Sequence, residues 1–183
     1  MQHAELFLSL AEIAGVFVGF GALIAVRSGG SARPAEVLFV SLLVLTGVQA
    51  IAMALVPVVI GGFDIPGHAV WASCSIVALA VFWVGQWVHE RFSPERRAYI
   101  SAAGLGARGR REWEVVGAVF WLPMTVALAL IVLGPVPDLE AALYVAAVVL
   151  IVLMDAELLL AMVTMGAPAW RPSPGDEKAT NVG

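Results

Sequence analysis

The chain has 183 residues, of which 61% are hydrophobic and only 13% charged, and its formal net charge is −4. Soluble globular domains are roughly 45–50% apolar and about 25% charged, so this composition excludes an ordinary soluble domain. The single cysteine, Cys74, excludes a disulfide bond within the chain. We therefore expect an all-α integral membrane protein in contact with the lipid bilayer, with no cofactor and no nucleic-acid partner.

The first long apolar segment, at about residues 5–26, carries an acid where lipid is expected. About 20 apolar residues cross the ~30 Å hydrocarbon core of a bilayer. Glu12 lies inside this segment, and Gly15 and Gly19 follow one turn apart, with Ala22 continuing the same face. Small residues at this spacing let another helix approach closely, so we assign these three to helix packing, within the bundle or in a dimer. The N-terminal flank lacks the Lys or Arg of a signal peptide, and we expect the segment to be retained.

Four further apolar segments follow, and the loops between them differ in charge. The segments lie at about residues 36–60, 69–89, 114–134 and 140–165. The loops at 27–35 and 90–113 and the tail at 167–183 contain all nine Arg and the one Lys, whereas the two remaining connections contain none. Five spans put these three basic regions on one side, which the positive-inside rule identifies as cytoplasmic.

These features together predict one transmembrane domain and its orientation. We expect a polytopic five-helix domain over residues 1–166, with the N-terminus outside and the C-terminus inside. The tail, residues 167–183, is rich in Pro, Gly and charge and has little to bury, so we expect it to be disordered. The predominance of Arg over Lys, alongside many Ala and Gly, indicates a GC-rich bacterium. The expected location is therefore a bacterial inner membrane.

The long basic loop, residues 90–113, has two possible roles. Its arginines are positioned to contact anionic lipid headgroups at the inner leaflet. The residues assigned to this contact are Arg96, Arg97, Arg110 and Arg111. A solvated loop that only fixes the topology explains the same residues. Gly104, Gly106 and Gly109 match a dinucleotide-binding fingerprint, but the match follows no strand, so we interpret it as a flexible loop.

Three acids lie inside apolar segments with no Lys or Arg in any span to neutralise them: Glu12, Asp155 and Glu157. An intramembrane acid in this position is a candidate functional group. It can be a neutral acid hydrogen-bonded to a polar neighbour, a proton carrier, or a ligand for a cation. The candidate polar neighbours are Ser41, Thr46, Gln49, Ser73, Ser75 and Thr125, and we count Gln49 among the ion candidates.

Helical geometry separates two of these acids. Asp155 and Glu157 are two residues apart, so they point about 200° away from each other. Glu157 shares a face with the small and polar residues Ala161 and Thr164, so we expect it to point into the bundle. Asp155 is then expected to face another helix beyond the bundle, from a second copy or a partner.

The depths of the acids in the membrane depend on where the last span begins. With the spans given above, Glu12 lies about 10 Å and Glu157 about 24 Å from the outer edge of the membrane. The two acids are then at different depths and do not form a close pair. A later start of the last span, near Ala146, brings the two depths together. The sequence leaves both arrangements open.

The sequence supports two main hypotheses about function. A membrane enzyme is a third and less favoured one, because nothing marks a nucleophile or a metal site. The sequence contains no Ser-His-Asp order, no HExxH pair, no Walker lysine and no recognisable metal-ligand spacing. The first hypothesis is a small channel-like or transporter-like protein, in which Glu12 and Glu157 handle protons or cations. The alternative is a non-catalytic assembly or accessory membrane subunit, whose acids and Gly15-x-x-x-Gly19 face bind partner helices. The expected protein partner is a second copy of the chain or another membrane protein.

Overall fold

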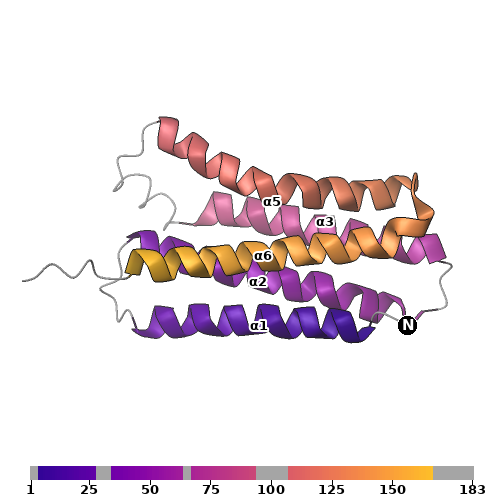
Figure 1. Cartoon of the computed structure of the whole chain (residues 1–183), viewed down its shortest axis with the longest axis horizontal. Coiled ribbons are helices and arrows are strands. Elements are labelled where there is room, and N and C mark those ends of the chain that lie inside the picture. The colour runs from indigo at the N-terminus through magenta and orange to yellow at the C-terminus, as the bar shows by residue number, and fades with distance from the viewer. Residues whose placement is uncertain (1–3, 28–33, 64–66, 94–106, 167–183) are drawn as a thin grey trace, which may run out of the picture.

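The computed structural model describes residues 4–27, 34–63, 67–93 and 107–166, and these residues form an all-α fold. Five long helices make up the described chain (Figure 1). They are α1 (Ala4–Arg27), α2 (Pro34–Ile60), α3 (Gly67–Phe92), α5 (Ala107–Leu133) and α6 (Glu140–Gly166), and a 3-10 turn, η1 (Pro137–Leu139), precedes α6.

Each of the five helices overlaps one of the predicted apolar segments. The largest difference is at α5, which begins at Ala107, so residues 107–113 are helical and not part of a loop. The prediction followed apolar residues alone, whereas a helix continues past the apolar region as long as its backbone hydrogen bonds are made. The rest of the predicted basic loop, residues 94–106, and the predicted disordered tail, 167–183, lie outside the described residues.

Four of these helices are long and apolar enough to cross a membrane. The corresponding segments are Ala4–Ile24, Val37–Ile60, Gly67–Phe92 and Pro137–Thr164, and the apolar part of α5 is shorter, at Gly117–Leu133. Large apolar side chains such as Leu23, Trp87 and Leu160 are more than half exposed on the outside of the bundle. An apolar exterior is what contact with lipid requires.

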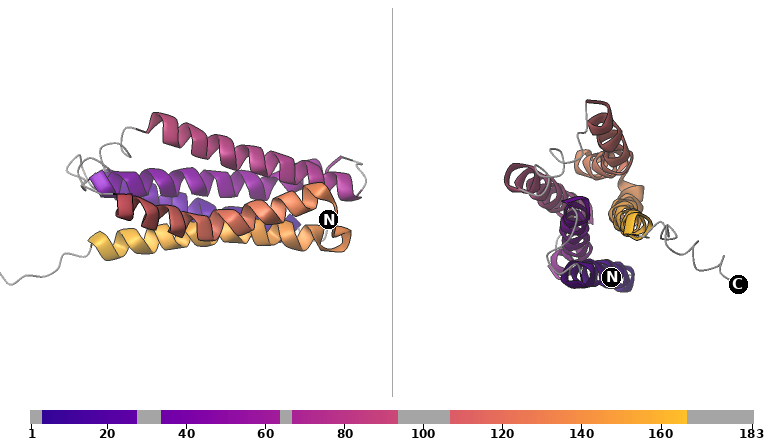
Figure 2. Two further views of the ribbon diagram at one scale, coloured as in Figure 1. Left: turned by 90° about the horizontal axis from the view of Figure 1, so that it is seen from above. Right: turned by 90° about the vertical axis from the view of Figure 1, so that its left-hand side faces the viewer.

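Consecutive helices run in opposite directions, so α1, α3 and α6 all begin at the same end of the bundle (Figure 1). Two helices are central: α2 packs against α1, α3 and α6, and α6 packs against α1, α2, α3 and α5. In the end-on view, α1 and α5 lie at opposite edges of the assembly (Figure 2). The contacts of α1 are made mainly with α2 and α6.

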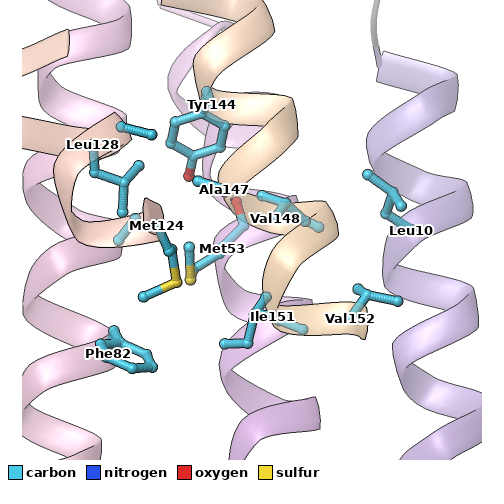
Figure 3. Packing of buried hydrophobic residues seen from close by; sticks show 14 of the residues in the cluster. Leu10, Met53, Phe82, Met124, Leu128, Tyr144, Ala147, Val148, Ile151 and Val152 are labelled. Atoms are coloured by element: carbon cyan, nitrogen blue, oxygen red, sulfur yellow. Dashed lines mark hydrogen bonds between the residues drawn. The ribbon is translucent and has the colours of Figure 1, made fainter. Parts of the chain in front are cut away.

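The core lies where α6 faces α2, α3 and α5. Tyr144, Val148, Ile151 and Asp155 are all buried, and their spacing of four, three and four residues places them on one face of α6. Figure 3 shows the first three of these side chains meeting Met53 and other apolar residues of the neighbouring helices. This face fixes the rotation of α6 in the bundle.

A proline within α2 explains the buried tyrosine of α6. Pro57 has no backbone N–H, so it cannot donate to the carbonyl of Met53, four residues earlier. The Tyr144 hydroxyl donates to that carbonyl oxygen instead, at 2.8 Å (Figure 3). The ring also packs against Phe7 and Trp71, with both ring centroids 5.8 Å away. One side chain thereby satisfies the freed carbonyl of α2 and joins α1, α3 and α6.

The end of the bundle at which α1 begins is closed by a polar contact between α3 and α6. His68 pairs with Glu140, whose side chain is only 4% exposed. Gly134, in the turn between α5 and α6, has φ +72°, and a Cβ there would lie 3.2 Å from the His68 ring. Glycine therefore suits this position for its backbone conformation and for the space it leaves.

Candidate functional site

Asp155 is the acid that the structure places inside the bundle. It is 0% exposed and faces α2, where the Thr46 hydroxyl is hydrogen-bonded to its Oδ1 atom. Its other oxygen, Oδ2, is buried without a hydrogen-bond partner among the described residues. The structure shows no Lys, Arg or His side chain, within the ranges it describes, paired with this carboxyl group. A buried acid with one orphaned oxygen and no cation is the most unusual group in the described core.

The single hydroxyl proton of Thr46 has three acceptors within reach: the backbone carbonyl oxygens of Leu42 and, at 3.4 Å, of Leu43, and Oδ1 of Asp155. Its Oγ1 atom lies 2.8 Å from the backbone carbonyl oxygen of Leu42, the contact that a helical threonine commonly makes with the residue four positions earlier. The same Oγ1 contacts Asp155. A hydroxyl group can donate only one hydrogen bond, so the second contact is a hydrogen bond only if its partner donates.

Gly47, next to Thr46, brings α1 up to this acid. A Cβ atom at Gly47 would lie 2.5 Å from Cγ2 of Val18, 3.5 Å from the carbonyl oxygen of Ala14 and 3.6 Å from Oδ2 of Asp155. Only a residue without a side chain allows α1 and α2 to approach so closely. The acid is thus enclosed where α1, α2 and α6 meet.

Gln49, one turn further along α2, joins α2 to α3. Its side-chain amide donates to the carbonyl oxygens of Phe82, at 3.0 Å, and Val81, at 3.2 Å. Its Oε1 atom accepts a weaker contact from Gln86 at 3.5 Å. A Cβ added at Gly85 would collide with the Gln49 amide. The predicted ion candidate Gln49 therefore has its donors directed to the α3 backbone.

Glu12 and Glu157 lie on the outside of the described bundle, where both side chains are exposed. Glu12 is two residues from both Leu10 and Ala14, which are buried, so it projects from the opposite face of α1. Glu157 is likewise opposite Asp155 on α6. The prediction that Glu157 points inward and Asp155 outward was wrong. The large side chains Tyr144 and Ile151, more than the small residues Ala161 and Thr164, define the inner face of α6.

The two outward acids lie at similar depths along the bundle. Because Gly47 approaches both Ala14 and Asp155, these residues share one level. Glu12 is two residues before Ala14, and Glu157 is two residues after Asp155 on a helix that runs in the same direction. Their levels therefore differ by roughly 6 Å. The two acids therefore have similar depths, although α6 begins at Glu140 and not near Ala146, where the sequence analysis placed the start for this arrangement.

Gly15, Gly19 and Ala22, which were predicted to pack against another helix, make no close helix contact within the described bundle. No atom lies within 4 Å of a Cβ built at Gly15 or at Gly19, and Gly19 and Ala22 are exposed. The glycines in close helix contacts are Gly47 and Gly85. The prediction of packing within the bundle was therefore wrong for Gly15 and Gly19, while packing against another chain stays a prediction.

The arginines assigned to anionic lipid cannot be placed at side-chain level. Arg96 and Arg97 lie outside the described residues, and Arg110 and Arg111 lie in the first turns of α5, where only the backbone is described. Their contact with lipid headgroups stays a prediction.

The sequence analysis named Thr46 among the candidate polar neighbours of the buried acids. It did not identify the close helix contacts at Gly47 and Gly85, or the contact of Gln86 with Gln49. A signal for the Tyr144 contact was present, because Pro57 implies a free carbonyl four residues earlier.

The described residues hold no group of three His, Cys, Asp or Glu side chains able to bind a metal ion. The arrangement around Asp155 is suited to holding a proton at one carboxyl group. No protein-family model, no curated protein and no solved structure matches this chain.

Proposed function

We propose that the chain is a membrane subunit that assembles with partner helices through the outer face of α1. One observation carries the proposal: Glu12 projects from the face of α1 opposite to its buried residues. An acid at the centre of a membrane helix costs about 2.5–3.5 kcal/mol when inserted, which disfavours a lipid-facing position. A second helix over this face would replace lipid with a hydrogen-bonding partner.

The neighbours of Glu12 on this face suit contact with a helix. Gly15 and Gly19 follow it, and neither meets any described atom within 4 Å of a Cβ built on it. Small residues in a row leave a shallow surface into which another helix can pack. We call Glu12, Gly15, Gly19 and Ala22 the α1 outer stripe. Glu157, on the outward face of α6, offers a second polar contact at a similar depth.

The proposed orientation has five crossings, with the N-terminus outside and the C-terminus inside a bacterial inner membrane. Arg27 ends α1, Arg91 lies in the last turn of α3, and α5 begins with an arginine-rich turn. These three helix ends lie at one end of the bundle (Figure 1). The positive-inside rule assigns such an end to the cytoplasm. The 17 apolar residues of α5 are at the lower limit for a crossing.

The test of assembly compares two substitutions, each of which adds a large side chain to the outer surface of the bundle. Gly19→Leu places a large side chain on the α1 outer stripe, and Ala80→Leu places the same side chain on an exposed position of α3. The measurements are recovery of an untagged copy by a tagged copy, and recovery of a stoichiometric membrane protein from native membranes. We expect Gly19→Leu to abolish the association and Ala80→Leu to preserve it.

Two results would contradict assembly through this face. One is a wild-type chain that is a 19.2 kDa protomer in lipid particles, with neither a second copy nor a stoichiometric partner. The other is an association that both variants leave unchanged.

Proton or cation transport is a second candidate function. The observation in its favour is that Glu5, Ser9 and Glu12 are all exposed along one face of α1. Copies assembled around this face would line a shared path with carboxyl and hydroxyl groups. We expect Glu12→Gln to abolish proton or cation flux into proteoliposomes, while Glu140→Gln, at a buried position paired with His68, preserves it. Absence of flux in the wild-type protein would remove this candidate.

A further inference from the structure

We propose that Asp155 is a proton-binding site within the membrane, closed to water by the packing of α1 against Gly47. The ligand is a single proton: release leaves a carboxylate at Asp155 and transfers the proton to water, and uptake reverses the step. The proposal concerns the interior of one chain and does not depend on a partner at the α1 outer stripe.

The hydrogen bonds around Thr46 favour the protonated acid. If the Asp155 carboxyl group carries a proton, it donates to Oγ1 of Thr46, and the Thr46 hydroxyl donates to the carbonyl oxygen of Leu42 at 2.8 Å. Both observed contacts are then hydrogen bonds. If the group is ionised, Thr46 must donate to it, and Oδ2 remains a buried charged oxygen without a donor. A charge buried in that way is far more costly than a neutral carbonyl oxygen.

No described titratable group faces Asp155 to compensate a charge. Among the described side chains of α1 and α6, the others are Glu5, Glu12, Glu140, Tyr144 and Glu157. Glu5, Glu12 and Glu157 are exposed, Glu140 pairs with His68, and the Tyr144 hydroxyl donates to a carbonyl oxygen. The described side chains of α2 and α5 include no titratable group.

On α3, which also packs against α6, the titratable groups lie away from the level of Asp155. His68 pairs with Glu140 in the first turn of α6. Cys74 lies one turn after Trp71, whose ring packs against Tyr144, eleven residues before Asp155. The remaining groups, His89, Glu90 and Arg91, lie in the last turns of α3.

A proton suits this site better than a metal cation. Metal cations that bind oxygen, such as Ca²⁺, require six or more oxygen ligands at short distances. The side-chain oxygens described at this site are the two of Asp155 and the one of Thr46, and Val18 occupies the space beside Gly47. A proton needs only the carboxyl group and one acceptor.

Access to the site depends on the fit of α1. Oδ2 of Asp155 lies beside Gly47, which in turn contacts Ala14 and Val18 of α1. Moving α1 away from α2 would uncover this oxygen, and a carboxylate gains more from hydration than a neutral acid does. Loss of the proton therefore favours the open position of α1, and binding of the proton favours the closed one.

The protonation state is tested by infrared spectroscopy of the whole protein in lipid vesicles at near-neutral pH. We expect a carbonyl stretch of a protonated carboxylic acid that disappears in Asp155→Asn and persists in Glu12→Gln and Glu157→Gln. Thr46→Val should shift that band to the position of a free acid, and Thr46→Ser should restore it. A spectrum in which Asp155→Asn removes no such band would overturn the proposal, because the carboxyl group would then be ionised.

The closing role of α1 is tested by the rate at which the same band shifts after transfer to D₂O. Gly47→Ala forces Val18 to move, and we expect the exchange to be about tenfold faster or more. Gly67→Ala is the matched control, since its added methyl group meets nothing within 4 Å, and its rate should equal that of the wild type. If Gly47→Ala does not insert, Val18→Ala loosens the same contact and should also accelerate exchange. Equal rates in all variants would overturn the closure by α1.

Discussion

At the scale of single residues, Asp155 and Glu157 differ in their surroundings although they are two positions apart on α6. Their opposite directions could be predicted from helical geometry, but the inward acid could not be identified. In a soluble helix the apolar face marks the interior. In α6 both faces are apolar, because one faces lipid and the other faces protein. Sequence reasoning then relied on the small residues Ala161 and Thr164, whereas the packing of Tyr144 determined the rotation.

The contact between Tyr144 and the carbonyl freed by Pro57 gives a prediction at this scale. Tyr144→Phe removes the only hydroxyl donor shown to that carbonyl, and we expect unfolding in mixed detergent to become easier by about 0.6–1.7 kcal/mol. In a Pro57→Ala background residue 57 regains its N–H and can donate to Met53, so the cost of Tyr144→Phe should fall. The four free energies of this double-mutant cycle measure the coupling. An equal cost in both backgrounds would show that the hydroxyl does not replace the missing donor.

At the scale of helices, close contacts depend on single glycines opposite large or polar side chains. Gly47 faces Val18, and Gly85 faces Gln49. The regular spacing of Gly15 and Gly19 was the stronger sequence pattern, yet no part of the described chain covers these two residues. An isolated glycine carries no spacing signal, so its neighbour can be identified only when the rotation and register of both helices are known. Thr46 could be proposed as a partner for an acid because polar residues are scarce in these helices.

The contact between α2 and α3 gives a prediction at this scale. Gly85→Ala places a methyl group against the Gln49 amide, which donates to the α3 carbonyls, and we expect a loss of stability of about 1–3 kcal/mol. Gly15→Ala, with open space around it, should lose none and can gain up to about 1 kcal/mol from helix propensity. Reversible unfolding in detergent, followed by circular dichroism, compares the two variants. A Gly85→Ala protein as stable as Gly15→Ala would show that the Gln49 contact is not tight.

At the scale of the whole molecule, the number of helices and their approximate ends followed from segment length and hydropathy. These properties are local, and each helix satisfies its backbone hydrogen bonds within its own segment, so they can be predicted one segment at a time. Which helices pack against each other cannot be predicted from single segments. The central positions of α2 and α6, and the packing of α1 against both, depend on side chains far apart in the sequence.

All inferences about lipid-facing acids depend on five crossings of the membrane, with every basic side chain on the cytoplasmic side. Orientation is measured most directly by labelling single cysteines with a membrane-impermeant maleimide. In a Cys74→Ala background, cysteines replace Ser31 and Ser101 in the two basic loops, and Asp64 and Asp138 in the two connections without Lys or Arg.

In intact cells we expect the reagent to label the cysteines at positions 64 and 138, and to label those at 31 and 101 only after the membrane is opened. Labelling of positions 31 and 101 from opposite sides would contradict the crossing of both α2 and α3, and with it the arrangement of five crossings. It would also remove the basis for placing Glu12 against a partner helix.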